Sequence, residues 1–353
     1  IDGRPPLIDI PVVENAKTKL HFAAANRHAT GQPFFLAVGI KRPHLVWRVP
    51  KGIVDKYYNP ANFTPALPVR TVLDKSVDPV AWTPFYTNDP YSPLADDRIR
   101  ELRRHYYSAI TWADYCAGQV LGTLAAVGLE EETLVIIHAD HGWHLGEYNM
   151  WEKRTIWELG TRVPFMVHVP WIPQSHGQRS GAPTELVDVF PTMIDVAGLP
   201  PLTGDAFPLE GRSLRPVLEN PSLPTLPDRD FALSTYARCP VVNGPVWNDA
   251  CIHIVERSVF RFMGYTIRTR EYRYTEFVAW NGTTLSPEWD KVHSRELYNH
   301  TLDIPGQGTW ERQDDFEDVN LVTSADPALV ALLASKLRSA FGSGGRPQLA
   351  ASL

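Results

Sequence analysis

Short apolar runs alternate with amphipathic helical patterns through the first two-thirds of the chain, and this alternation limits the folds available to it. Residues 33–39, 133–139 and 163–169 have the length and apolar content of buried strands. Residues 98–128 and 186–197 carry apolar side chains at steps of three and four, which predicts helices. Because such strands and helices form a sheet that is covered on both faces, the sequence predicts an α/β fold with a mostly parallel sheet.

The pattern changes towards the C-terminus. A Pro-rich stretch at residues 216–227 indicates a linker. Beyond it, residues 265–278 alternate like two antiparallel strands, and residues 327–341 have the pattern of a final helix. We therefore predict a larger domain over residues 1–227 and a smaller C-terminal α+β subdomain over residues 228–353.

Charge and hydropathy exclude some classes of function. The formal net charge is −6, from 40 acidic and 34 basic residues, so the chain lacks the basic surface that nucleic-acid binding requires. An anionic substrate stays compatible with this charge, because a few local cations can dominate a pocket. No apolar run approaches the ~18 residues of a membrane span. Residues 1–11 lack the basic and apolar segments of a signal peptide.

Three N-x-S/T sequons, at Asn62, Asn281 and Asn299, are compatible with secretion or a lysosome. From them we expect a lysosomal, secreted or periplasmic location. The oligomeric state is left open by the sequence.

The three cysteines, Cys116, Cys239 and Cys251, do not have the spacing of a metal site. Cys116 falls in a helical pattern and is expected to be a small buried side chain. Cys239 and Cys251 flank a loop and can pair in an oxidising compartment, but the sequence leaves both outcomes open.

Polar side chains follow two of the predicted strands. Residues 34–39 run into Lys41, Arg42 and His44, and residues 134–139 run directly into Asp140 and His141. In an open parallel sheet, ligands bind beyond the carboxyl ends of the strands, so these residues are candidates for a site. Loops at such positions are also where functional residues concentrate.

Asp140 and His141 are adjacent and can both turn towards one ion. A carboxylate suits a hard cation such as calcium or magnesium, whereas an imidazole is more typical of zinc or another transition metal. The alternative is that Asp140 caps a helix and His141 is only buried. The loop that follows favours a site, since it contains Trp143 and several ionisable groups directly after a buried strand.

Lys153 lies thirteen residues after Asp140, close enough in sequence to return to the same cleft. Its ammonium group could bind a tetrahedral anion as a compact point charge. The alternative for a single lysine is a solvated surface side chain.

Taken with their order along the chain, these motifs resemble the sulfatase family, and within it the iduronate-2-sulfatase group and its bacterial relatives. The resemblance extends from about residue 33 to residue 322. The matching segments are residues 33–39 with 41–44, 140–147 with Trp151 and Lys153, 162–165, 186–192, 210–214, 263–269 with 272–275, and 296–299.

The resemblance implies an alkaline-phosphatase-like α/β fold and the hydrolysis of sulfate esters, with sulfated carbohydrate as the expected substrate. It implies one calcium ion (Ca2+), for which Asp140 and His141 would be two of the ligands. His44 would contact the sulfate and assist proton transfer, and Lys153 would bridge a sulfate oxygen and the leaving group. Trp143 matches a residue that lies near the substrate in the closest relatives.

One part of the family pattern is absent. The family's nucleophile is a cysteine in Cys-x-Pro-Ser-Arg that is converted to formylglycine, and no cysteine here has that context. The nucleophile, together with an early Asp-Asp calcium pair, is expected upstream of Ile1. We therefore expect the chain alone to show no meaningful turnover and weakened calcium binding.

Two other functions stay open at this point. The same fold class includes phosphate ester hydrolases, which usually use Thr or Ser as nucleophile. A non-catalytic protein that binds sulfated glycans could keep the cations Lys41, Arg42, His44 and Lys153. Asp140, His141 and Lys153 together argue against a pure binder, because binding alone has no need of a calcium carboxylate.

Overall fold

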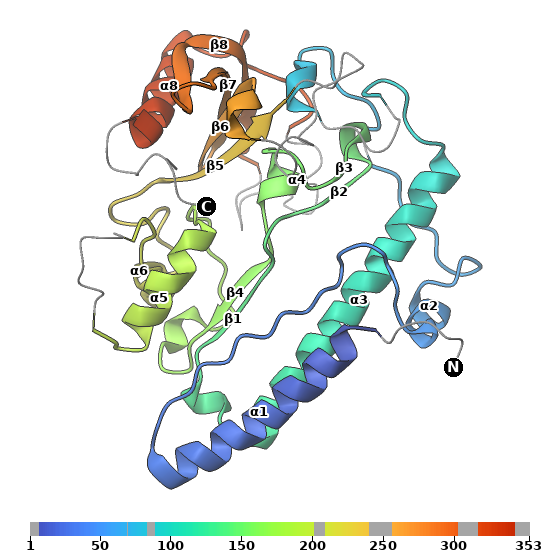
Figure 1. Cartoon of the computed structure of the whole chain (residues 1–353), viewed down its shortest axis with the longest axis vertical. Helices are drawn as coiled ribbons and strands as arrows, with labels where there is room; N and C mark the ends of the chain where they lie inside the picture. The colour runs from blue at the N-terminus through green and yellow to red at the C-terminus, as the bar shows by residue number, and fades with distance from the viewer. Residues whose placement is uncertain are drawn as a thin grey trace. The chain divides into compact units, whose positions relative to one another are not determined.

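The computed structural model describes residues 7–68, 70–82, 89–200, 209–239, 256–302 and 317–342 (Figure 1). Within these residues, no helix combines the length and the apolar character that a membrane crossing needs. The chain divides into two compact units, of which the first consists of Ile1–Leu67 with Ala95–Thr133 and the second of Pro68–Leu94 with Leu134–Leu353.

The first unit is helical. Its two long helices, α1 (Asp9–Thr30) and α3 (Asp96–Ala126), pack side by side, and α2 (Lys51–Tyr57) and the short 3-10 helix η2 (Glu130–Glu132) complete it (Figure 1). Two aspartates in the first turn of α3 favour its start, because negative charge stabilises the N-terminus of a helix. The helix predicted for residues 98–128 is therefore confirmed, with its end just before Gly128, whose φ is 73°.

The strand predicted for residues 33–39 is wrong. Within the described part of the chain this segment belongs to no strand, although its exposure alternates from one residue to the next as in an extended chain. The apolar run correctly indicates extended backbone, but a strand also needs a partner for its N–H and C=O groups. The sequence pattern carries no information about that partner.

The second unit contains the remaining elements. Its first strands, β1 (Val135–His138) and β4 (Phe165–His168), pair with each other, and β2 (His144–Leu145) pairs with β3 (Trp151–Glu152). The helical elements before the C-terminal sheet are η1 (Pro79–Ala81), η3 (Glu147–Asn149), α4 (Glu158–Thr161), η4 (Pro173–Ser175), η5 (Leu186–Asp188), α5 (Val189–Val196) and α6 (Arg215–Glu219).

The predicted strands near residues 133–139 and 163–169 are confirmed as β1 and β4, but their parallel pairing is wrong. β1 and β4 run antiparallel, with Val135 opposite His168, and every paired strand among the described residues is antiparallel. An apolar run predicts burial and extension, whereas strand direction depends on how the chain returns between two strands. The alternation of strands and helices, from which we predicted the parallel sheet, does not fix that return.

A buried ion pair holds the start of α5. Asp188 accepts a hydrogen bond from the backbone of Glu185 at 2.7 Å, and Arg229 pairs with the carboxylates of both residues. Asp188 is fully buried, so this arginine is needed to compensate its charge. Residues 186–197, predicted as one helix, form η5 followed directly by α5.

A four-stranded antiparallel sheet and one helix form the C-terminal part, as predicted. The strands pair in the order β5-β6-β7-β8 (Figure 1). Apolar side chains of α8 pack with those of the sheet in one core. The division at residue 228 stays a prediction, since the two compact units cut the chain elsewhere. The bounds are β5 (Phe231–Arg238), η6 (Arg257–Val259), β6 (Phe262–Thr269), β7 (Tyr272–Asn281), β8 (Ser286–Asn299) and α8 (Pro327–Gly342).

The cysteines divide into two kinds. Cys116 is a free, buried thiol on α3, as predicted, and burial raises its pKa to about 11. Such a thiol is chemically inert at neutral pH. Cys239 is disulfide-bonded. Cys251, with which the sequence left a pairing open, lies outside the described residues.

Glu296, on β8, is a buried carboxylic acid on which the charges of Glu317 and Arg238 act. Its side chain is fully buried. Burial, reinforced by the negative charge of Glu317, raises the pKa of Glu296 to about 8 against an ordinary value of 4.5. Between pH 4.5 and about pH 8 the folded chain keeps the proton of Glu296, whereas the unfolded chain releases it. The free energy of unfolding therefore falls as pH rises through this range.

We predict that Glu296→Gln removes this pH dependence. Relative to the unmodified chain, its free energy of unfolding should rise by about 3 kcal/mol between pH 5 and pH 8 and then level off. Urea unfolding across this pH range measures the difference. The exposed Glu131→Gln is the control and should follow the unmodified chain. Parallel profiles for the unmodified chain and Glu296→Gln would show that Glu296 does not titrate in this way.

Candidate active site

Asp140 and His141 lie in the loop that follows β1, and their side chains face each other. Oδ2 of Asp140 lies 3.4 Å from Nε2 of His141, and the two side chains are 85% and 30% exposed. Asp140 begins no helix, so the alternative of a helix cap does not hold. The pair is open to solvent on the side of the carboxylate.

The contact of Nδ1 of His141 determines which ring nitrogen carries the hydrogen, and therefore what the pair can bind. Nδ1 lies 2.8 Å from the carbonyl oxygen of Gly142, which can only accept, so Nδ1 carries the hydrogen. In the neutral ring, Nε2 then presents a lone pair to Asp140, and two acceptors face each other. A proton or a cation between them resolves this arrangement. Metal-binding histidines commonly donate their second N–H to a backbone carbonyl in this way.

Gly142 fixes the loop against α4. Its N–H donates to the carbonyl of Gly160 at 2.9 Å. A Cβ atom at Gly142 would lie 2.1 Å from the carbonyl oxygen of Leu159 and 2.6 Å from that of Arg162, so no side chain fits. The glycine after His141 is therefore required by the close approach of two backbone segments.

The hairpin of β2 and β3 brings Lys153 back to the same loop. Nζ of Lys153 lies 5.2 Å from the centroid of the Trp143 ring, which is the geometry of a cation–π contact. The rings of His141 and Trp143 are 6.2 Å apart. The structure thus brings together four of the predicted site residues, Asp140, His141, Trp143 and Lys153, on one loop and hairpin of the second unit.

His44 belongs to the first unit, where it is exposed on a short turn. The backbone N–H of His44 donates to the backbone carbonyl of Lys41 at 3.0 Å. The backbone N–H of Lys41 in turn donates to the side chain of the buried Asp9, on α1, at 2.7 Å. Arg42 supports the turn from within by donating to the carbonyl of His44 at 3.1 Å. The placement of His44 beside Asp140 and Lys153 stays a prediction.

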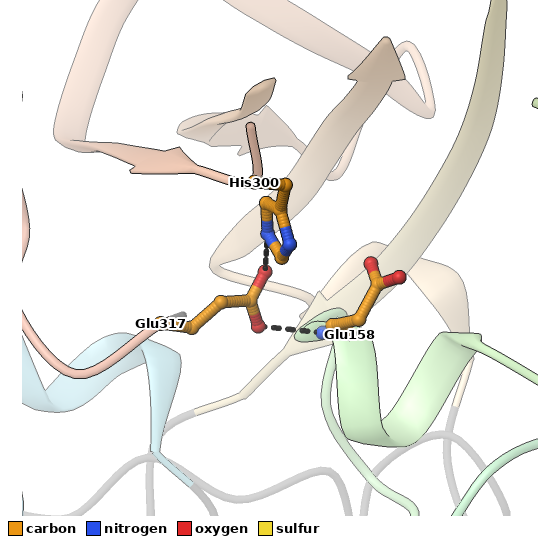
Figure 2. A group of neighbouring side chains, drawn as sticks. All are labelled: Glu158, His300 and Glu317. Carbon is orange, nitrogen blue, oxygen red and sulfur yellow. Dashed lines mark hydrogen bonds and ion pairs between the residues drawn. The ribbon is translucent and has the colours of Figure 1, made fainter. Parts of the chain in front are cut away.

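The described residues contain one further group that could ligate a metal, and sequence reasoning missed it. Figure 2 shows Glu158, His300 and Glu317, all buried, whose ligand atoms lie within 4.8 Å of one another. Nε2 of His300 lies 3.2 Å from Glu317, which also accepts from the backbone N–H of Glu158 at 2.6 Å. These residues are far apart in sequence, so no local pattern could have found them.

Arginines already compensate the charge of this group. Arg273 pairs with both Glu158 and Glu317, and Nε of Arg268 lies 3.1 Å from Glu158. Although burial raises the pKa of Glu158, the charges of Arg268 and Arg273 hold it well below its usual value. A cation would have to displace a guanidinium, so we interpret the group as an ion-pair network that joins α4 to the C-terminal sheet.

The sequence matches known proteins in the same region as this site. The sequence profile of the sulfatase family matches residues 9–199, which is more than half of the chain. The chain belongs to the sulfatase family.

Among curated relatives, this sulfatase is 32% identical to mouse iduronate 2-sulfatase over 317 residues. The match covers 76% of this chain and 56% of that protein, so the chain spans about half the length of the relative. The resemblance to this group, predicted from the motifs, is confirmed.

Solved structures show the same fold. The phosphonate monoester hydrolase of Agrobacterium radiobacter matches with a TM-score of 0.62 at 23% identity and covers 91% of this chain and 60% of its own. A protein in complex with its substrate D-glucosamine-2-N,6-O-disulfate matches with a TM-score of 0.55 at 18% identity, over 94% of this chain and 72% of its own. The predicted alkaline-phosphatase-like class, with helices and sheets and a C-terminal antiparallel sheet, is confirmed.

We predict that Arg273→Met strongly destabilises the protein. The change removes the main counter-charge of the buried Glu317 and one of two arginines that pair with the buried Glu158, so the free energy of unfolding should fall by about 3–5 kcal/mol. The matched control is Arg98→Met, which removes an exposed pair with Glu101 on α3 and should cost less than about 1 kcal/mol. Urea unfolding measures both. Equal, small losses in the two variants would contradict the ion-pair interpretation.

Proposed function

We propose that this sulfatase hydrolyses a sulfate ester of a carbohydrate with the help of one calcium ion. The observation that carries the proposal is the meeting of Asp140, His141 and Lys153 on one loop and hairpin, in a chain of the sulfatase family. The carboxylate of Asp140 and the imidazole of His141 would bind a cation, and the ammonium group of Lys153 would bind an anion. A sulfate ester is an anion that such a pair of charges would bind.

Asp140 and His141 would hold the calcium ion. Oδ2 of Asp140 and Nε2 of His141 face each other at 3.4 Å, so a cation between them could be bound by both atoms. The hydrogen bond from Nδ1 of His141 to the carbonyl of Gly142 holds the ring in this orientation. When bound, the ion would supply positive charge that neutralises sulfate oxygens. Other ligands would have to complete its coordination, because calcium takes about six to eight oxygens.

Lys153 would bind a sulfate oxygen and stabilise the negative charge that develops on the departing alcohol oxygen. His44 would give a proton to that oxygen, which is the role of a general acid. Trp143 lies beside Lys153 and would offer an apolar ring to a sugar face, as well as restrict the position of the ammonium group.

The nucleophile would come from outside this sequence. Formylglycine, which the family makes from a cysteine in Cys-x-Pro-Ser-Arg, cannot come from Cys116, Cys239 or Cys251, because none has that context. This chain therefore carries the half of the apparatus that binds the sulfate and assists the leaving group.

The names of two related proteins support a substrate class. The name iduronate 2-sulfatase and the substrate D-glucosamine-2-N,6-O-disulfate both describe sulfated sugars. We therefore propose a sulfated carbohydrate as substrate, with a lysosomal, secreted or periplasmic location supported by the sequons at Asn62, Asn281 and Asn299.

We predict that the chain joined to the segment that precedes it in its gene hydrolyses an aryl sulfate and that the chain alone does not. The reason is that the nucleophile is absent from the 353 residues. In the extended protein, Lys153→Ala should lower kcat about a hundredfold. Comparable activity with and without the extension would contradict the proposal. Faster hydrolysis of an aryl phosphate would assign the site to phosphate esters instead.

Calcium binding provides a second prediction. By calorimetric titration, Asp140→Asn should weaken calcium binding about tenfold or more, because it removes the only charged ligand of the pair. Glu317→Gln is the control, since we interpret its carboxylate as paired with Arg273 rather than with a metal. Loss of binding in Glu317→Gln with no effect of Asp140→Asn would place the metal in the buried group instead.

A further inference from the structure

Lys153 lies on a turn whose backbone is unusually constrained. It follows β3, and the preceding Glu152 has a φ of 68°, in the left-handed region that non-glycine residues rarely adopt. The carbonyl of Lys153 accepts the N–H of Thr155 at 2.9 Å, which closes a three-residue turn. Such a conformation persists only where surrounding contacts hold it.

The side chain of Thr155 supplies one of those contacts. Its Oγ1 lies 2.9 Å from Nε2 of His144, and both side chains are buried. Among the described residues, Nδ1 of His144 has no hydrogen-bond partner. Thr155 is therefore the polar contact on which this buried imidazole depends.

His144 is neutral under ordinary conditions. Burial lowers the pKa of its imidazole to about 4, and the negative charge of Glu317 opposes this shift. The contact between His144 and Thr155 is thus a hydrogen bond between neutral groups.

The strand register connects this contact to the cation–π pair. His144 lies opposite Glu152 in the pairing of β2 with β3. The next residues outward from this pair are Trp143 and Lys153, whose ring and ammonium group are in contact. The hydrogen bond between His144 and Thr155 therefore lies at the end of the hairpin where Trp143 and Lys153 meet.

A second contact holds the same turn from the C-terminal sheet. Arg238 on β5 is fully buried and donates from Nη1 to the carbonyl of Arg154 at 2.9 Å. Its Nε and Nη2 donate to the carbonyls of Val80 and Ala81 at 2.9 and 3.0 Å. This guanidinium keeps the turn attached to the sheet, whereas the contact between His144 and Thr155 sets its conformation.

We propose that the hydrogen-bonded pair of His144 and Thr155 positions the ammonium group of Lys153 over Trp143. Neither residue touches the ester, so both are positioning residues. The consequence for sulfate binding rests on the function proposed above. The placement of the ammonium group itself does not depend on that function.

Thr155→Val tests the proposal, because valine keeps the volume of threonine and removes only the hydroxyl. Thr155→Ser keeps the hydroxyl and serves as the rescue variant. Thr275→Val is the matched control, since it removes one buried hydroxyl hydrogen bond, at 2.9 Å to Thr266, elsewhere in the same unit.

The measurement uses the full chain with its lysines labelled as 13C-dimethyl-lysine. The NMR signal of Lys153 is the one that disappears in Lys153→Arg. The part of its chemical shift that comes from the Trp143 ring current is measured by comparison with Trp143→Ala. We expect Thr155→Val to move the Lys153 signal to its position in Trp143→Ala, while Thr155→Ser and Thr275→Val leave it unchanged. An unmoved signal in Thr155→Val, or an equal movement in Thr275→Val, overturns the proposal.

Turnover separates this proposal from the proposed function. In the extended protein, Thr155→Val should lower kcat about tenfold or more with a smaller change in KM, because a displaced charge acts mainly on the transition state. If Lys153→Ala leaves the hydrolysis of aryl sulfate unchanged, the proposed role of Lys153 fails. The positioning of its ammonium group would still be decided by the lysine signal.

Discussion

The buried pair of Arg273 with Glu158 and Glu317 is the interaction on which the second unit depends. It joins β7 of the C-terminal sheet to α4, and α4 in turn forms the surface against which Gly142 packs. The loop that carries His141 is therefore positioned by charges that lie far from it in sequence. The C-terminal sheet acts as a support for the candidate site as well as a fold of its own.

A second connection runs to Lys153. Arg238, from β5 of the same sheet, donates to the turn that follows β3, and the pair of His144 and Thr155 sets the shape of that turn. Both charges of the candidate site, the carboxylate of Asp140 and the ammonium of Lys153, are thus held by backbone that the sheet supports. An exposed carboxylate and a half-buried ammonium group on well-supported backbone suit a site that must bind a charged substrate without rearranging.

Local patterns predicted what depends on local chemistry. The long helix α3, the C-terminal sheet and the contact of Asp140 with His141 all follow from residues that are near one another in sequence. The direction of β1 and β4 and the missing partner of residues 33–39 depend on chain return and pairing, which periodicity does not record. The buried network around Arg273 joins residues more than a hundred positions apart, so only the folded chain reveals it.

The central proposal is that Asp140 and His141 bind one divalent cation and that Lys153 binds one sulfate. A crystal structure of the extended protein with calcium and sulfate tests this most directly. The account predicts a calcium ion at about 2.4 Å from an oxygen of Asp140, with His141 as its neighbour. It also predicts sulfate oxygens on Lys153. A calcium ion bound instead among the buried residues around Glu317, or a sulfate remote from Lys153, would contradict the account.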